Sequence, residues 1–237
     1  MSTFSTALAD LTRAQKPKRG VSLYSRFINR PLGRVFAAAC YALRFTANQV
    51  TVTSALVTAG ALAVLILAPA VWWRGILVAA LLVLGFALDS ADGQVSRLTR
   101  TSSKAGEWLD HVVDAGKMVA VHGCVLVAFF VSTPMPSGIR PFALVMPLAF
   151  QLVAVVMFAG GVIVELLARI GATVPAPARP TSAARALALL PADFGVLSLS
   201  FALFGWPPVF LTVYALLLLA NLMIAVLLLG KWFRELS

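Results

Sequence analysis

Four aspartates are the residues of this 237-residue sequence most able to do chemistry, because they stand in two close pairs within apolar stretches. Asp89 and Asp92 are three residues apart, and Asp110 and Asp114 are four apart, so on helices each pair lies on one face. A carboxylate inside a bilayer costs roughly 2.5 to 3.5 kcal/mol on insertion scales. We therefore expect a cation to neutralise the four acids, and a divalent metal ion is the simplest one.

The residues around the acids favour a hard metal ion and a phosphate-bearing substrate. Carboxylates without histidine or cysteine partners suit Mg²⁺ or Mn²⁺, and two such ions could share the four acids. Gly93 and Gly106 have no side chains beside the acids, so a phosphate could approach closely. Arg97 offers a guanidinium suited to a pyrophosphate. Cys40 and Cys124 lack metal-ligand spacing, and we interpret both as packing residues.

The elements that must position these acids are membrane helices. Hydrophobic residues make up 60% of the chain and charged residues 12%, which excludes a soluble globular domain. We predict an all-α integral membrane protein, in which residues 1–46 form a cytoplasmic arm with an amphipathic juxtamembrane helix and residues 47–237 form the transmembrane domain. Six predicted spans of about 20 residues or more cover approximately residues 47–68, 72–95, 106–132, 140–168, 184–205 and 208–230.

The net charge of +10 reflects membrane topology and does not indicate nucleic-acid binding. Sixteen basic residues fall on one side of the predicted spans, only Arg74 and Arg140 fall on the other, and Lys117 is within a span. The sixteen are Arg13, Lys16, Lys18, Arg19, Arg26, Arg30, Arg34, Arg44, Arg97, Arg100, Lys104, Arg169, Arg179, Arg185, Lys231 and Arg234. This distribution predicts a multi-pass protein of the cell membrane with both termini and the 96–105 loop in the cytoplasm, and an arm that contacts anionic lipids.

The two acidic pairs are predicted to face each other across a helical hairpin. Asp89 lies eight residues before Arg97, and Asp114 lies eight residues after Gly106. Each acid is therefore about 12 Å of helix from the shared cytoplasmic loop. If the two faces meet, the carboxylates converge in the cytoplasmic third of the membrane.

The spacing of these residues resembles the signature of the CDP-alcohol phosphotransferase family, also called CDP-alcohol phosphatidyltransferases. The matching residues, in fixed order and spacing, are Asp89, Asp92, Gly93, Arg97, Gly106, Asp110 and Asp114. Ser96 stands where the family usually has alanine. The motif covers about 26 residues, and the six-helix prediction also fits the family.

The resemblance implies a membrane enzyme, usually a homodimer, that transfers a phospho-alcohol or phosphatidyl group from a CDP-alcohol to an acceptor hydroxyl and releases CMP. The acceptor would be a lipid or a polar alcohol, and phospholipid synthesis is the context that the family favours. By the same resemblance the four aspartates would hold the metal ions, and Asp114 would also deprotonate the acceptor. Residues implied to hold the nucleotide are Gly93, Arg97, Gly106, Asn48 and Thr51.

Recognition of the acceptor is the least determined part of the prediction. Lys117, one turn past Asp114, either contacts an anionic acceptor or balances the charge of the acids. Arg179 and Arg185 either bind an acceptor phosphate or only reflect the topology. Residues 101–111 resemble the choline and ethanolamine branch of the family, whereas residues 18–30 resemble members that use inositol phosphate.

Three other polar residues and two rival functions stay open. His111 either packs or hydrogen-bonds beside the acids, or it binds a metal ion. Glu165 and Asp193 either line the cavity, or they snorkel or form hydrogen bonds between helices. A divalent-cation transporter could use the same aspartates, but it would place them near the membrane midplane. A membrane prenyltransferase also binds diphosphate through metal-bridged aspartates, usually with more helices and another acid spacing.

Overall fold

A computed structural model describes residues 4–13, 21–68, 71–133, 137–171 and 182–237, and every regular element among them is helical. The predicted all-α class is confirmed. Five of the helices are long and apolar enough to cross a membrane. They are α3 (Ala47–Leu67), α4 (Trp72–Thr99), α5 (Lys104–Val131), α6 (Arg140–Gly171) and α9 (Pro207–Leu236). These correspond to five of the six predicted spans and make the chain a multi-pass membrane protein.

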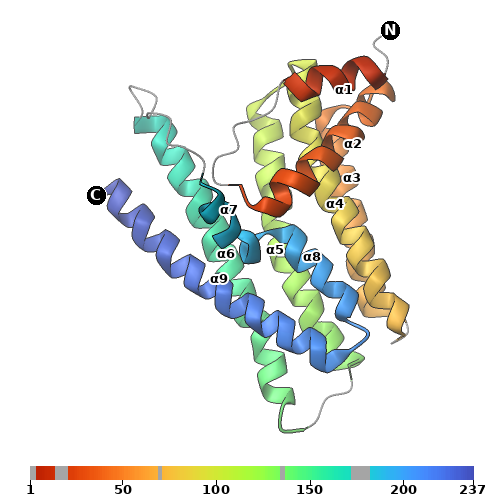
Figure 1. Cartoon of the computed structure of the whole chain (residues 1–237), viewed down its shortest axis with the longest axis vertical. Coiled ribbons are helices and arrows are strands. Elements are labelled where there is room, and N and C mark those ends of the chain that lie inside the picture. The colour runs from red at the N-terminus through yellow and green to blue at the C-terminus, as the bar shows by residue number, and fades with distance from the viewer. Residues whose placement is uncertain (1–3, 14–20, 69–70, 134–136, 172–181) are drawn as a thin grey trace.

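The predicted span at 184–205 is divided into four short helical pieces. They are α7 (Ala183–Ala188), η2 (Leu190–Ala192), α8 (Phe194–Ser200) and η3 (Phe201–Leu203). Pro191 has no amide hydrogen to continue α7, and the Asp193 side chain accepts a hydrogen bond of 2.8 Å from the Gly195 amide to begin α8. In Figure 1 this segment starts at mid-height and α8 runs toward the lower end, where α9 begins.

The N-terminal arm packs on the core helices and leaves an apolar face exposed. It consists of α1 (Phe4–Arg13), a π-helical turn η1 (Ser25–Asn29) and α2 (Arg30–Ala42). A Cβ on Gly33 would lie 2.8 Å from the Ser90 hydroxyl, so α2 touches α4 one residue from Asp89. Phe27 and Val35 are exposed, as expected of a helix at a lipid interface.

The apolar core occupies the half of the bundle away from the arm. It contains stacked and edge-on aromatic rings, which are Phe129, Phe150, Phe201, Phe204, Phe210 and Tyr214. The Tyr214 hydroxyl lies 2.6 Å from His122 Nδ1, which satisfies a histidine that is otherwise buried among these rings. Arg74, also buried, donates to the Ala68 carbonyl at 2.9 Å and to the Ser132 hydroxyl at 3.2 Å.

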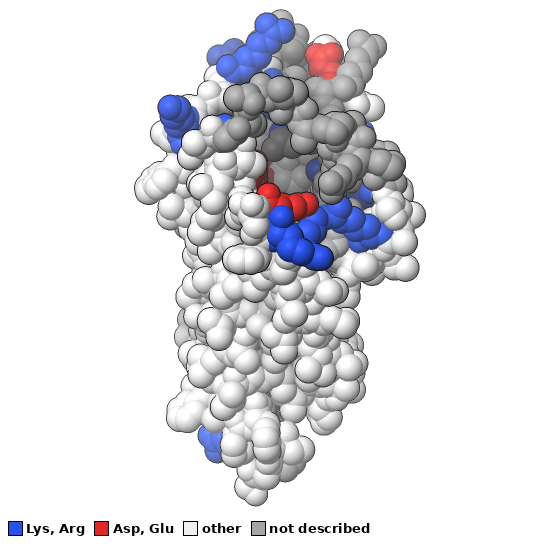
Figure 2. Space-filling view, turned by 90° about the vertical axis from the view of Figure 1, so that its left-hand side faces the viewer, with Lys and Arg blue, Asp and Glu red and all other residues white. Residues whose placement is uncertain are grey.

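The two ends of the molecule differ in charge. Helix α1, the C-terminal end of α9 and the loop between α4 and α5 lie in the same half of the bundle (Figure 1). Figure 2 shows Lys and Arg side chains gathered in that half on one face, with acidic side chains beside them and an almost uncharged surface below. The orientation in which the charged half faces the cytoplasm was predicted from this same distribution of basic residues, and it stays a prediction.

Candidate metal and nucleotide site

Three of the four predicted metal-binding carboxylates meet between α4 and α5. One oxygen from each of Asp89, Asp92 and Asp110 can be chosen so that all three lie within 4.8 Å of one another. Asp92 is buried, and the other two are half-buried. Because the three ligands are all carboxylates, the cluster fits a hard divalent ion better than zinc. Asp114 does not belong to this group.

The buried acid of the cluster is held by a neighbouring helix. Thr51 of α3 donates its hydroxyl to Asp92 Oδ2 at 2.6 Å. The Asp92 side chain is 7% exposed, so this charge-assisted hydrogen bond operates away from most solvent. Thr51 therefore orients an acid in addition to its predicted nucleotide contact.

Asp114 pairs with a lysine instead. Its Oδ1 lies 3.4 Å from Lys117 Nζ, and the same ammonium contacts Asp89 Oδ1 at the edge of the cluster. Lys117 is 8% exposed and donates a third hydrogen bond to the Ser54 hydroxyl at 3.0 Å. The lysine that could have contacted an acceptor is thus committed to the acids.

A pocket of about 490 Å³ opens beside the cluster and includes all five residues predicted to hold the nucleotide. Those residues are Gly93, Arg97, Gly106, Asn48 and Thr51. Asp92 and Asp110 also line it, whereas Asp89, Asp114 and Lys117 do not. Arg97 Nε is buried and has no hydrogen-bond partner in the described part of the chain. A guanidinium in that state suits an anionic ligand.

The lack of a side chain at Gly106 keeps the pocket open between α3 and α5. A Cβ at this position would lie 3.1 Å from Asn48 Oδ1 and 3.2 Å from the Ser103 hydroxyl. Ser103 caps α5 by accepting from the Gly106 amide at 3.0 Å, so the start of the helix is fixed beside the pocket. The sequence predicted that this glycine lets a phosphate approach closely. In the structure the side-chain amide of Asn48 lies in the space that a side chain at this position would fill.

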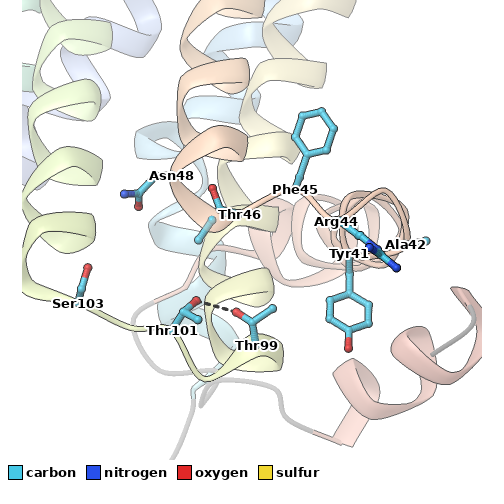
Figure 3. A pocket seen from close by; sticks show the side chains of 10 residues that line it. Tyr41, Ala42, Arg44, Phe45, Thr46, Asn48, Thr99, Thr101 and Ser103 are labelled. Atoms are coloured by element: carbon cyan, nitrogen blue, oxygen red, sulfur yellow. Dashed lines mark hydrogen bonds between the residues drawn. The ribbon is translucent and has the colours of Figure 1, made fainter. Parts of the chain in front are cut away.

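A second hollow of about 580 Å³ adjoins the first and shares Ala47, Asn48, Thr101 and Ser103 with it. It lies between the end of α2 and the loop after α4. Figure 3 shows Asn48 pointing from α3 toward α5, and Thr99 hydrogen-bonded to Thr101. This hollow is lined by hydroxyls, aromatic rings and Arg44, without a carboxylate.

Charged residues of α5 and α6 form one rim of the 490 Å³ pocket. Arg169 donates to Glu107 at 2.5 Å and to Glu165 at 2.6 Å. All three side chains are exposed, so these pairs are worth little in stability and mainly set the charge of the rim. Glu165 therefore lines the pocket, which was one of its two predicted roles, whereas Glu107 was not singled out from the sequence. His111 lines the same pocket and packs edge-on against Phe158.

The remaining predicted acceptor residues are not part of this pocket as described. Arg185 is exposed on the short helix α7 and does not line it. Arg179 lies outside the described residues. Neither prediction gains support from the geometry.

Asp193 fastens the N-terminal arm to the start of α8. Its Oδ2 accepts hydrogen bonds from the hydroxyls of Ser22 and Ser25, the second at 2.6 Å, while its Oδ1 caps α8. The ring of Tyr24 lies against Gly195, where an added Cβ would be 1.8 Å from the ring. Burial raises the pKa of Tyr24, and the Asp193 charge raises it further. We call these three polar residues, Ser22, Ser25 and Asp193, the arm anchor.

These features define a polytopic membrane protein with a carboxylate cluster beside a pocket rich in glycine and arginine. A model of the CDP-alcohol phosphatidyltransferase family matches residues 44–233, and the chain belongs to that family. The protein is therefore a membrane transferase whose family takes CDP-alcohols as donors and hydroxyls as acceptors. No curated protein matches the chain.

Proposed function

We propose that the protein transfers a phospho-alcohol or phosphatidyl group from a CDP-alcohol to an acceptor hydroxyl, with release of CMP, in phospholipid synthesis. The observation that carries the proposal is the Asp89, Asp92 and Asp110 cluster beside the pocket that contains Gly93, Arg97 and Gly106 of the family motif. Mg²⁺ or Mn²⁺ held by these three acids would neutralise phosphate oxygens and stabilise the departing CMP phosphate.

The chain's own residues bind the donor and move the proton. Arg97 holds the diphosphate, which Gly93 and Gly106 let approach closely because they have no side chains, while Asn48 contacts the nucleoside. The acceptor oxygen attacks the phosphorus that carries the alcohol, and the bond from that phosphorus to the CMP oxygen breaks. The Asp114 carboxylate accepts the proton of the acceptor hydroxyl. A carboxylate outside the three-acid cluster keeps an oxygen available for this role.

The topology and assembly complete the proposal. The charged half of the bundle, with both termini and the pocket, faces the cytoplasm, where a soluble cytidine nucleotide is available. Lipids surround the apolar half, and the protein functions as a homodimer.

Turnover of CDP-alcohols tests the proposal. Purified protein with Mg²⁺ or Mn²⁺ should release CMP from at least one member of a panel of CDP-linked lipid and polar alcohols. Asp114→Asn should abolish this release and retain CDP binding, because the acid lies outside the pocket that holds the nucleotide. Asp10→Asn, on the exposed surface of α1, is the matched control and should remain active. No release from any donor would refute the proposed reaction, and a fully active Asp114→Asn variant would refute the base.

The transporter alternative receives less support from the placement of the acids. Asp92 lies seven residues before the end of α4, about 10 Å along the helix, and not at the middle of a span. Flux of Mn²⁺ into liposomes without a CDP-alcohol would favour that alternative, and consumption of a prenyl diphosphate would favour a prenyltransferase.

A further inference from the structure

Lys117 is a buried charged group beside the acids, and the proposed reaction gives it no task. Its ammonium lies among three helices, against Asp89 of α4, Asp114 of α5 and Ser54 of α3. An ammonium has three hydrogens to donate, and here three acceptors receive them. The side chain is 8% exposed, so these contacts replace its hydration.

The third acceptor is oriented for this purpose by its own hydrogen bond. The Ser54 hydroxyl donates to the Gly85 carbonyl at 3.0 Å, so its lone pairs remain to accept from Lys117. Ser54 and Gly85 are close because α3 and α4 pack tightly there. The position of the ammonium is therefore supported by neighbours on two helices as well as by the acids.

We propose that the Lys117 ammonium takes the place of a second divalent ion, so that each chain holds one metal ion at Asp89, Asp92 and Asp110. This inference rests on the proposed function, in which the cluster binds Mg²⁺ or Mn²⁺. A second ion would need Asp114 as a ligand. The Lys117 ammonium already contacts Oδ1 of Asp89 and lies 3.4 Å from Oδ1 of Asp114. Such an ion would also bring two positive charges next to a buried ammonium, where repulsion is weakly screened.

The proposal changes what the fourth aspartate does. Asp114 would be held by an ammonium through Oδ1 and not by a divalent ion, so its Oδ2 would be left to accept the proton of the acceptor. The site would then separate one acid for proton transfer from three acids for metal binding, although all four belong to one motif.

Counting bound Mn²⁺ by electron paramagnetic resonance tests the proposal without measuring turnover. Wild-type protein in lipid nanodiscs should bind one Mn²⁺ per chain, with the spectrum of an isolated ion. Lys117→Met, which keeps the length of the side chain and removes its charge, should bind two. Paired ions about 3.5 to 4 Å apart should then give a broadened, coupled spectrum. Lys231→Met, on α9 and paired with Glu235, is the control and should still bind one ion.

Two results would overturn the proposal: a coupled pair of ions in the wild-type protein, or a folded Lys117→Met variant that still binds one. The wild-type count decides the question by itself if the variant does not fold. CMP release measured on the same preparations separates the two proposals. Active protein with two ions overturns only the role of Lys117, and protein with one ion but no activity on any donor overturns only the proposed reaction.

Discussion

Removing the Asp193 carboxylate should release the N-terminal arm from the bundle. The anchor joins residues far apart in the sequence, because the Ser22 and Ser25 hydroxyls both donate to one oxygen of this acid. The same side chain caps α8 through the Gly195 amide. In Asp193→Ala all three donors lose their acceptor, and the two serines cannot form the same contacts elsewhere on α8.

The energy of the anchor follows from its contacts. A hydrogen bond to a charged acceptor contributes about 1.5 kcal/mol at the lower end of the usual range, so the two serines together hold the arm by about 3 kcal/mol. Loss of the helix cap destabilises α8 by about 1 kcal/mol more, and this loss does not weaken the contact of the arm. Since about 1.4 kcal/mol corresponds to a factor of ten, opening of the arm should become about 100-fold more frequent.

Hydrogen–deuterium exchange of the 21–29 segment measures this opening directly. The Arg26 amide donates to the Ser22 carbonyl at 3.0 Å, and its exchange reports whether the arm is folded against α8. We expect about 100-fold faster exchange in this segment for Asp193→Ala, with a much smaller change in α3 and α5.

Two further variants separate the arm from the cap. The double variant Ser22→Ala with Ser25→Ala should speed exchange in residues 21–29 as much as Asp193→Ala does, and should leave α8 protected. Asp193→Asn should retain the cap through its amide oxygen and weaken only the serine contacts. Wild-type exchange rates in the double variant would refute this reasoning and would assign the hold on the arm to the packing of Tyr24 on Gly195.

Two other predictions concern the pocket and the far end of the bundle. Gly106→Ala should reduce CMP release at least tenfold, because the new methyl group displaces the Asn48 amide. Gly116→Ala on the same helix points into open space and should be fully active. Both substitutions raise helix propensity equally, so a difference in activity reports on the pocket. Equal activity of the two would contradict the role of Gly106. Arg74→Met should lower the free energy of unfolding by about 2 to 4 kcal/mol, because it removes two buried hydrogen bonds from a guanidinium. The control is Arg140→Met, which replaces an exposed arginine at the same end of the bundle and should change the free energy of unfolding by less than about 0.5 kcal/mol. Thermal unfolding of both variants measures the difference.

The part of the fold that the sequence predicts well is the part with strong local signals. The spans at α3, α4, α5, α6 and α9 follow from hydropathy, and the start of α3 follows from Thr46, whose hydroxyl accepts from the Gln49 amide. The span at 184–205 failed as one helix because hydropathy does not register Pro191 or the capping role of Asp193. The order proline, one residue, aspartate is a usable signal for a helix that begins anew.

The site is predictable where its geometry is local and hidden where it depends on partners from other helices. The spacing of the four aspartates predicted that they converge if the two helix faces meet, and the structure brings Asp89, Asp92 and Asp110 together. The spacing allowed Lys117 to balance the acids but could not decide between that role and contact with an acceptor, because the choice depends on Asp89 and Ser54 on other helices. The arm anchor is hidden for the same reason, since its two sides are 171 and 168 residues apart.

One face of α3 is polar over most of the length that lies beside the acids. Asn48, Thr51, Ser54 and Thr58 follow at spacings of three, three and four, so they share one face of the helix. Only the first two were connected to the site from the sequence. The structure adds Ser54, which supports Lys117, and shows that the polar face continues from the pocket to below the acids.

This polar face can approach the acids because α4 has a glycine, Gly85, opposite Ser54 and Thr58 of α3. A Cβ on Gly85 would lie 2.5 Å from the Thr58 hydroxyl, so a larger residue would push α3 away and break the hydrogen bond from Ser54 to the Gly85 carbonyl. The same displacement would draw the Thr51 hydroxyl away from Asp92, because Thr51 lies less than one turn from Ser54 on α3. Gly85 on α4 thus governs the positions of both the Asp92 carboxylate and the Lys117 ammonium. The hydrogen bonds of both should be lost together in any variant that separates α3 from α4.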